Sequence, residues 1–236
     1  MFRSLLPLAA LLAGFAPHSA LAQTVSPPPV PIASAPAPFA DEIAAFEAAD
    51  RIAMPTPGGV LFLGSSSIRL WTTLAEDFPG TRVLNRGFGG SLIAQSTRYL
   101  DRIVLPYAPR LIVFYAGDND LADRRTPEQV LADFAIFADH VHARLPATRI
   151  LFVAIKPSLA RWALVGRIRE ANRLVAAYAA ATDRIGYVDV FTPMLGAGGK
   201  PRPELFGPDG LHMTHAGYAL WRSVIAPYLA PGRASF

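Results

Sequence analysis

Short apolar runs alternate with longer amphipathic stretches along most of this chain. Most of these runs are four to six residues long, and many of their residues are β-branched. They cover 59–63, the shorter 82–84, 111–115, 150–155 and 185–190. Continuous apolar runs of this length are typical of parallel strands that are buried on both faces. The sequence therefore predicts a parallel five-stranded sheet.

The stretches between these runs have the spacing of helices, which we expect at about 41–51, 91–104, 127–144, 161–182 and 214–229. The clearest is 127–144, where Val130, Phe134, Phe137 and Val141 fall on one side of a helix. Strands that alternate with helices predict an α/β fold, a three-layer α/β/α sandwich.

The first 22 residues have the pattern of a secretory signal peptide. Arg3 supplies the positive charge, residues 5–15 form an apolar stretch, and Ala20 and Ala22 make a small-x-small cleavage pattern. The apolar stretch is well short of the roughly 20 residues that a transmembrane helix needs. We expect cleavage after Ala22 and a secreted or periplasmic protein with no stable membrane span; an uncleaved anchor is the alternative.

Composition and charge limit the domain organisation and the partners that we expect. Residues 23–40 are dense in Pro and Ala and predict an extended linker, which leaves 41–236 as one folded domain. With no cysteine, the chain has no disulfide, no lipidated cysteine and no cysteine nucleophile. The net charge of +4 is spread without a run of like charges, so we expect no nucleic-acid partner. The oligomeric state stays open.

Polar or glycine-rich segments follow the first three apolar runs, at 64–67, 85–91 and 117–120. Open α/β sheets bind their ligands at the carboxyl ends of the strands. We therefore expect the three segments to meet in one crevice. A fourth segment, at 209–212, lies shortly before the last predicted helix.

Each segment carries a group that acyl transfer needs. A serine in 64–67 offers a nucleophile once a base takes its proton, although chemistry alone does not choose among Ser65, Ser66 and Ser67. Glycines in 85–91 expose backbone N–H groups, and Asn119 offers an amide donor to an oxyanion. Taken singly, each segment has a plain alternative, either a helix cap or a tight turn.

Asp209 and His212 are three residues apart, a spacing that lets the carboxylate orient the imidazole toward a serine. The alternative is a metal site that includes His215. No further His or Cys cluster completes such a site, and we expect His215 to begin the last helix.

The four segments in this order resemble the four blocks of the SGNH hydrolase superfamily, the GDSL-type esterases and lipases, across about residues 59–229. The resemblance implies a flavodoxin-like sheet and selects Ser66 as the nucleophile. It implies Asp209 and His212 as the other members of the triad. The oxyanion hole is then formed by the backbone N–H groups of Ser66 and Gly90 and by the Asn119 amide.

One position departs from the family pattern, because Ser65 stands where the family has an aspartate. The GSSS sequence at 64–67 and the segment 155–162 resemble a branch in which this exchange is usual. In that segment Ser158, Arg161 and Trp162 are predicted substrate contacts; the alternative is a loop that packs Trp162 into the core.

These inferences predict a serine esterase that needs no metal or organic cofactor. Its substrate would be a small-molecule ester, a glycan or a lipid, with short-chain acyl esters, acetylated glycans and lysophospholipids as the candidates. A non-catalytic glycan- or lipid-binding protein on the same fold is one alternative. An acyltransferase that uses the same residues is the other.

Overall fold

Five strands form one parallel sheet within Met1 and residues 38–230, the part of the chain that the computed structural model describes. Their order is β2-β1-β3-β4-β5. Their bounds are β1 Val60–Gly64, β2 Val83–Gly87, β3 Leu111–Tyr115, β4 Arg149–Val153 and β5 Ile185–Val188. The predicted α/β class and the parallel five-stranded sheet are confirmed.

Register brings the ends of the first three strands together. Gly64 at the end of β1 pairs with Gly87 of β2 on one side and with Tyr115 of β3 on the other. The segments that follow these three residues therefore leave the sheet at the same edge, as the apolar pattern predicts.

Helices α4 (Ile93–Arg98), α7 (Pro127–Arg144) and α8 (Val165–Ala180) cover one face of the sheet. Phe114 of β3 and Phe152 of β4 are register partners, and both pack on Phe134 of α7, Phe114 by stacking and Phe152 edge-to-face. Thr126 begins α7 with a capping box to Gln129, and Pro127 follows at the first helical position. These local signals explain why the predicted bounds of α7 are confirmed.

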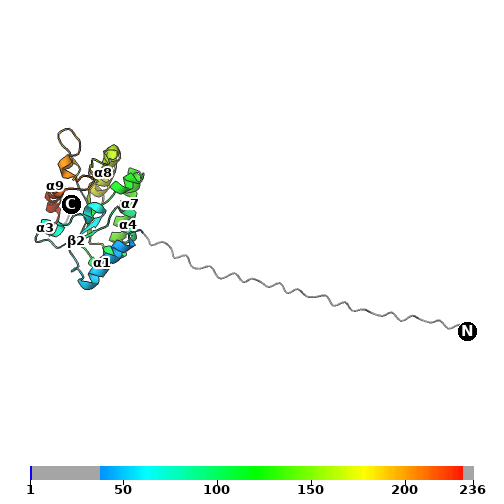
Figure 1. The fold of residues 1–236 in the computed structure, drawn as a ribbon. Coiled ribbons are helices and arrows are strands. Elements are labelled where there is room, and N and C mark those ends of the chain that lie inside the picture. The colour runs from blue at the N-terminus through cyan, green and yellow to red at the C-terminus, as the bar shows by residue number, and fades with distance from the viewer. Residues whose placement is uncertain (2–37, 231–236) are drawn as a thin grey trace. The chain divides into compact units, whose positions relative to one another are not determined.

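Helices α2 (Ser66–Arg69), α3 (Leu74–Asp77) and α9 (His215–Ile225) cover the opposite face, as Figure 1 shows for α3 and α9. Side chains alternate across a strand, so Phe62 of β1 and Tyr115 of β3 point away from α7. Phe62 contacts Trp71, which packs on Trp221 of α9, while Tyr115 contacts Trp221 directly. This aromatic cluster holds α9 against the segment after β1.

Several predicted helices are shorter or divided. The stretch 91–104 breaks at Tyr99 into α4 and α5 (Leu100–Ile103), and 161–182 begins with a 3₁₀ turn before α8. The remaining elements are α1 Ala40–Ile52, α6 Asp118–Ala122 and the 3₁₀ turns η1 Leu105–Tyr107, η2 Trp162–Leu164, η3 Thr192–Met194, η4 Pro203–Leu205 and η5 Ala226–Tyr228. Short helices such as α6 carry too few apolar positions to show a period.

The predicted signal peptide at 1–22 and most of the linker at 23–40 lie outside the described residues. At the end of the linker, Ala40 already belongs to α1. In the described part of the chain, no helix is both long enough and apolar enough to cross a membrane.

Candidate active site

The turn after β1 depends on a glycine. Gly64 has a φ of 135°, and a Cβ added there would lie 1.8 Å from the carbonyl oxygen of Tyr115. Only glycine tolerates both conditions. The next residue donates its backbone N–H to the same oxygen at 2.9 Å, and the chain then enters α2 with Ser66 as its first residue.

The structure distinguishes the three adjacent serines. Ser65 and Ser67 are each 1% exposed, whereas Ser66 is half-buried. The Oγ of Ser66 lies 2.9 Å from Nε2 of His212, while the Oγ of Ser67 accepts a hydrogen bond from Lys156. Ser66 is therefore the serine with both solvent access and a neighbouring base.

A short turn presents His212 to that serine. Asp209 Oδ1 accepts hydrogen bonds of 2.9 Å from the backbone N–H groups of Leu211 and His212. Its Oδ2 lies 2.6 Å from Nδ1 of His212. Hydrogen bonds lower the pKa of Asp209 to about 2, and the Leu211 N–H has the largest effect, with the His212 side chain second. An ionised carboxylate here keeps a proton on Nδ1 and leaves Nε2 free to accept one.

Helix α9 holds this turn beside the serine. It begins at His215, as the sequence predicts, and the side chain of Thr214 caps it by accepting the Gly217 N–H. Tyr218 donates its hydroxyl to the carbonyl of Ser67 at 3.0 Å. Among the described residues, no group of three or more His, Cys, Asp or Glu side chains could hold a metal ion.

The segment after β2 carries an accessible backbone turn. Phe88 donates its N–H to the Gly64 carbonyl at 2.9 Å, which ties this segment to the serine turn. Gly90 has a φ of 76°, and a Cβ there would meet no heavy atom within 4 Å. Gly90 is exposed, so this turn is open on the side where a side chain would project, while Ser91 beside it is fully buried.

Asn119 joins the segments after β2 and β3. Its Nδ2 donates to the Ser91 carbonyl at 3.0 Å, and its Oδ1 accepts from Nη2 of Arg161 at 2.9 Å. An arginine only donates and a carbonyl only accepts, so these two partners determine which way the amide points. Ser91 is the one acceptor that Nδ2 has among the described residues, which leaves its second hydrogen for a ligand.

The predicted substrate contacts lie in different surroundings. Ser158 is only 2% exposed, whereas Arg161 contacts Asn119 and Asp118. Trp162 is partly exposed, and Nζ of Lys200 lies 4.8 Å from the centre of its ring. Trp162 is thus the member of this set whose surroundings leave most room for a ligand.

A family model for the GDSL-like lipase/acylhydrolase family matches residues 59–220. The chain belongs to this family. Membership places it among hydrolases of the ester type, and the matched range includes all four segments described above.

Solved structures share the fold of this GDSL-like protein. A protein from Streptococcus pneumonia, described provisionally as a platelet activating factor, is 22% identical with a TM-score of 0.72, over 80% of this chain and 92% of the other. A GDSL-like lipase from Bacteroides thetaiotaomicron is 22% identical with a TM-score of 0.68, over 79% and 96%. A carbohydrate esterase of family 3 from Talaromyces cellulolyticus is 17% identical with a TM-score of 0.59, over 73% and 96%. No curated protein matches the sequence.

Sequence reasoning missed several side chains that support this GDSL-like site. Lys156 directly follows the apolar run of β4, and Glu42 of α1 accepts the Gly89 N–H at 3.1 Å. A lone lysine after a central strand is a signal that could have been noticed. The contact of Glu42 joins residues 47 positions apart and has no local signal.

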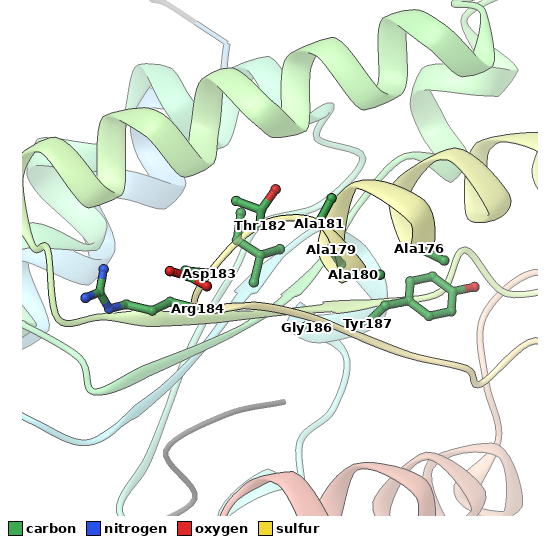
Figure 2. Close-up of a pocket in the computed structure, with 10 residues that line it drawn as sticks. Ala176, Ala179, Ala180, Ala181, Thr182, Asp183, Arg184, Gly186 and Tyr187 are labelled. Atoms are coloured by element: carbon green, nitrogen blue, oxygen red, sulfur yellow. The ribbon is translucent and has the colours of Figure 1, made fainter.

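A pocket of about 660 Å³ lies away from these groups, at the C-terminal end of α8 and along β5 (Figure 2). Its lining includes Thr182, Asp183 and Arg184, which precede β5, and therefore lies toward the amino end of that strand. The serine and histidine lie at the opposite, carboxyl-end edge of the sheet. The pocket contributes nothing to the candidate active site.

Proposed function

We propose that this protein is a serine esterase that hydrolyses carboxylic esters through an acyl-enzyme. The observation that carries the proposal is the continuous chain from Ser66 Oγ to His212 Nε2 at 2.9 Å and from His212 Nδ1 to Asp209 Oδ2 at 2.6 Å. This order of nucleophile, base and orienting carboxylate is the arrangement that activates a serine.

The reaction follows from this arrangement. His212 takes the proton of Ser66 as Oγ forms a bond to the ester carbonyl carbon, and the carbonyl electrons move to its oxygen. That oxyanion accepts hydrogen bonds from the backbone N–H groups of Ser66 and Gly90 and from the Asn119 amide. Collapse of the intermediate breaks the bond to the alcohol, which leaves with the proton from His212. Water then releases the acid by the same steps, with His212 again as the base.

We further propose that the acyl group is short and that the alcohol is part of a glycan or lipid. The side chains of His212 and Asp209 are 32% and 51% exposed, and Gly90 faces open space. An open site suits a small acyl group on a bulky alcohol better than a long chain, which would need a deep apolar pocket. Trp162 is the substrate contact that we retain. The named activity of the carbohydrate esterase with a similar fold is consistent with this choice.

The two alternatives make different demands on the site. A binding protein needs no proton-transfer chain, so the contact between His212 and Ser66 favours an enzyme. An acyltransferase would use the same residues and pass the acyl group to a sugar or lipid alcohol instead of water. The signal-peptide pattern at 1–22 supports export as part of the proposal.

The test compares serine variants. Ser66→Ala should abolish hydrolysis of p-nitrophenyl acetate and labelling by a fluorophosphonate, with an unchanged melting temperature. Ser65→Ala is the matched control, because the buried Oγ of Ser65 has no hydrogen-bond partner among the described residues and its loss should leave activity intact. A folded Ser66→Ala protein with wild-type activity would overturn the proposal. Comparing acetate with octanoate esters, with and without added alcohols, then tests acyl length and acyl transfer.

A further inference from the structure

The segment 155–162 supplies two cations that surround a carboxylate under the candidate oxyanion hole. Lys156 is buried, with 1% of its side chain exposed, and its Nζ lies 3.2 Å from Asp118 Oδ2. Nη1 of Arg161 lies 3.1 Å from the same oxygen. The Asp118 side chain is 7% exposed, so the three charged groups form a largely buried cluster beside Asn119.

The cluster connects the two ends of the proposed oxyanion hole. Lys156 donates to Ser67 Oγ at 3.0 Å, next to Ser66, whose N–H is one proposed donor. Arg161 donates to Asn119, which in turn donates to the carbonyl of Ser91, next to Gly90. A single line of contacts therefore runs from the neighbour of Ser66, through Asn119 itself, to the neighbour of Gly90.

The chemistry of each contact indicates that the cluster is charged. Lys156 faces three acceptors, Ser67 Oγ, Tyr115 OH and Asp118 Oδ2, which matches the three donors of an ammonium group. Burial alone would raise the pKa of Asp118, but the charges of Lys156 and Arg161 outweigh it and hold that pKa below its ordinary value. Burial lowers the pKa of Lys156, and the Asp118 carboxylate opposes that shift. With the ammonium charged, as its three acceptors indicate, two cations and one carboxylate leave a net charge of +1, the sign that stabilises a developing oxyanion.

The backbone before the cluster is also fixed. Asn172 of α8 accepts the Ile155 N–H at 2.8 Å and donates to the Ile155 carbonyl at 2.9 Å. The chain therefore enters Lys156 in one orientation, with the cation directed under the serine turn. Contacts of this kind, which fix the residues behind a hydrogen-bond donor, keep the donor within the narrow geometry that transition-state stabilisation requires.

We propose that Arg161 is a positioning residue for Asn119: its guanidinium, anchored by the Asp118 carboxylate that Lys156 also contacts, holds the amide so that its free N–H faces the oxyanion. This inference rests on the proposed esterase function. It gives Arg161 a different role from the substrate contact that the sequence predicts. Loss of Arg161 should lower the turnover number and leave substrate binding almost unchanged, because the contact acts through a group that binds the transition state.

The test is a double-mutant cycle on p-nitrophenyl acetate hydrolysis. Asn119→Ala should lower kcat by about 10²–10³-fold, as for the loss of other oxyanion donors. Arg161→Gln should lower kcat by about 10–100-fold with KM changed less than about threefold, and it should cost less than about threefold when Asn119 is already alanine. Arg173→Gln is the matched control, since Arg173 forms an exposed ion pair with Glu170 on α8 and should leave kcat unchanged.

Two further measurements separate positioning from folding. Melting temperatures identify a variant that has lost its structure, and Arg161→Lys, which keeps the charge but not the planar fork, should recover only part of the activity. If Arg161→Gln unfolds, the cycle is run with Arg161→Lys, whose defect must also vanish in the Asn119→Ala background. Three results would overturn the inference. They are losses of kcat in Arg161→Gln and Asn119→Ala that multiply in the double variant, an Arg161→Gln defect confined to KM, and an Arg161→Gln protein with wild-type kcat. A wild type that neither hydrolyses esters nor reacts with the fluorophosphonate would instead overturn the proposed function, and the inference with it.

Discussion

The Nε2 atom of His212 lies 2.9 Å from the Oγ atom of Ser66, although 146 residues separate them along the chain. The contact forms because both residues belong to segments held by one aromatic cluster. Trp71, just after α2, packs on Tyr218 and Trp221 of α9, and α9 follows the histidine turn. The site therefore depends on packing between the first and last parts of the described domain.

The pH dependence of activity should reflect one ionisation on its acid side. The Leu211 and His212 hydrogen bonds lower the pKa of Asp209 to about 2, so its carboxylate stays charged well below neutral pH. Its contribution to folding is present above its ordinary pKa of 3.8 and is lost only as the pH falls toward 2. We therefore expect Asp209 to add no ionisation of its own to the fall of kcat/KM on the acid side.

Two variants check this expectation. Asp209→Asn should reduce kcat by about 10³–10⁴-fold, because an amide N–H no longer holds the required tautomer of His212. His215→Ala, three residues from His212 and exposed, is the control and should retain wild-type kcat. A second ionisation between about pH 3 and pH 5 in the wild-type profile of kcat/KM would contradict the role given to Asp209.

Replacement by alanine should destabilise the fold far more at Gly64 than at Gly90. Gly64→Ala places a Cβ 1.8 Å from the carbonyl oxygen of Tyr115, at the end of the central strand β3, so we expect no stable protein. Gly90→Ala meets no atom within 4 Å and costs only the positive φ, about 1 kcal/mol of the free energy of unfolding. Urea denaturation measures both. Equal losses in the two variants would show that the turns are less constrained than the structure indicates.

Helix α1 should influence turnover through residues 87–91, the glycine loop that follows β2. Glu42 accepts the Gly89 N–H at 3.1 Å, next to Gly90. Glu42→Ala frees this loop, and we expect kcat to fall by about 3–10-fold, since the proposed oxyanion donor is then less well positioned.

The control for Glu42 lies on the same helix. Glu47 forms hydrogen bonds of 2.6 and 2.7 Å with Arg102, and among the described residues no hydrogen bond joins it to 87–91. Glu47→Ala should therefore change the melting temperature slightly and leave kcat unchanged. Equal effects of the two variants on kcat would mean that α1 acts only through overall stability.

Asp120 should make the protein less stable as the pH rises. Burial raises its pKa to about 6, against the opposing effect of the Ile93 N–H, which donates to it at 3.2 Å. Because the folded state binds this proton more tightly, its stabilising effect is complete below the ordinary pKa of 3.8 and is lost as the pH rises through about 6. The loss from this group amounts to at most about 3 kcal/mol.

Asp120→Asn should remove that dependence, since the amide oxygen can still accept the Ile93 N–H without a charge. The measurement is the urea midpoint at pH 5 and pH 8 for wild type, Asp120→Asn and Asp123→Asn. Asp123 is exposed and serves as the control, which should behave as wild type. An Asp120→Asn protein with the wild-type difference between the two pH values would contradict the raised pKa.

Much of the fold follows from local pattern. The run 111–115 predicts β3 with the bounds that the structure has, and the periodicity of 127–144 predicts α7, whose start is capped by Thr126 and Pro127. The predicted strand at 82–84 was too short, because β2 runs to Gly87 through Asn85 and Arg86, whose polar side chains find partners elsewhere. Arg86 is buried through contacts with Asp50 and Tyr107, which lie far from it in sequence.

The sequence by itself determined the succession of strands and helices along the chain and the edge of the sheet where the polar segments gather. Through the family pattern it also indicated which side chains to examine. These features depend on hydrophobic periodicity and on short motifs, which are local. Tertiary structure decided that Ser66 alone of three serines faces His212 and that Arg161 contacts Asn119. Both contacts are made by side chains from distant segments whose approach is set by packing, and packing has no signature in a stretch of neighbouring residues.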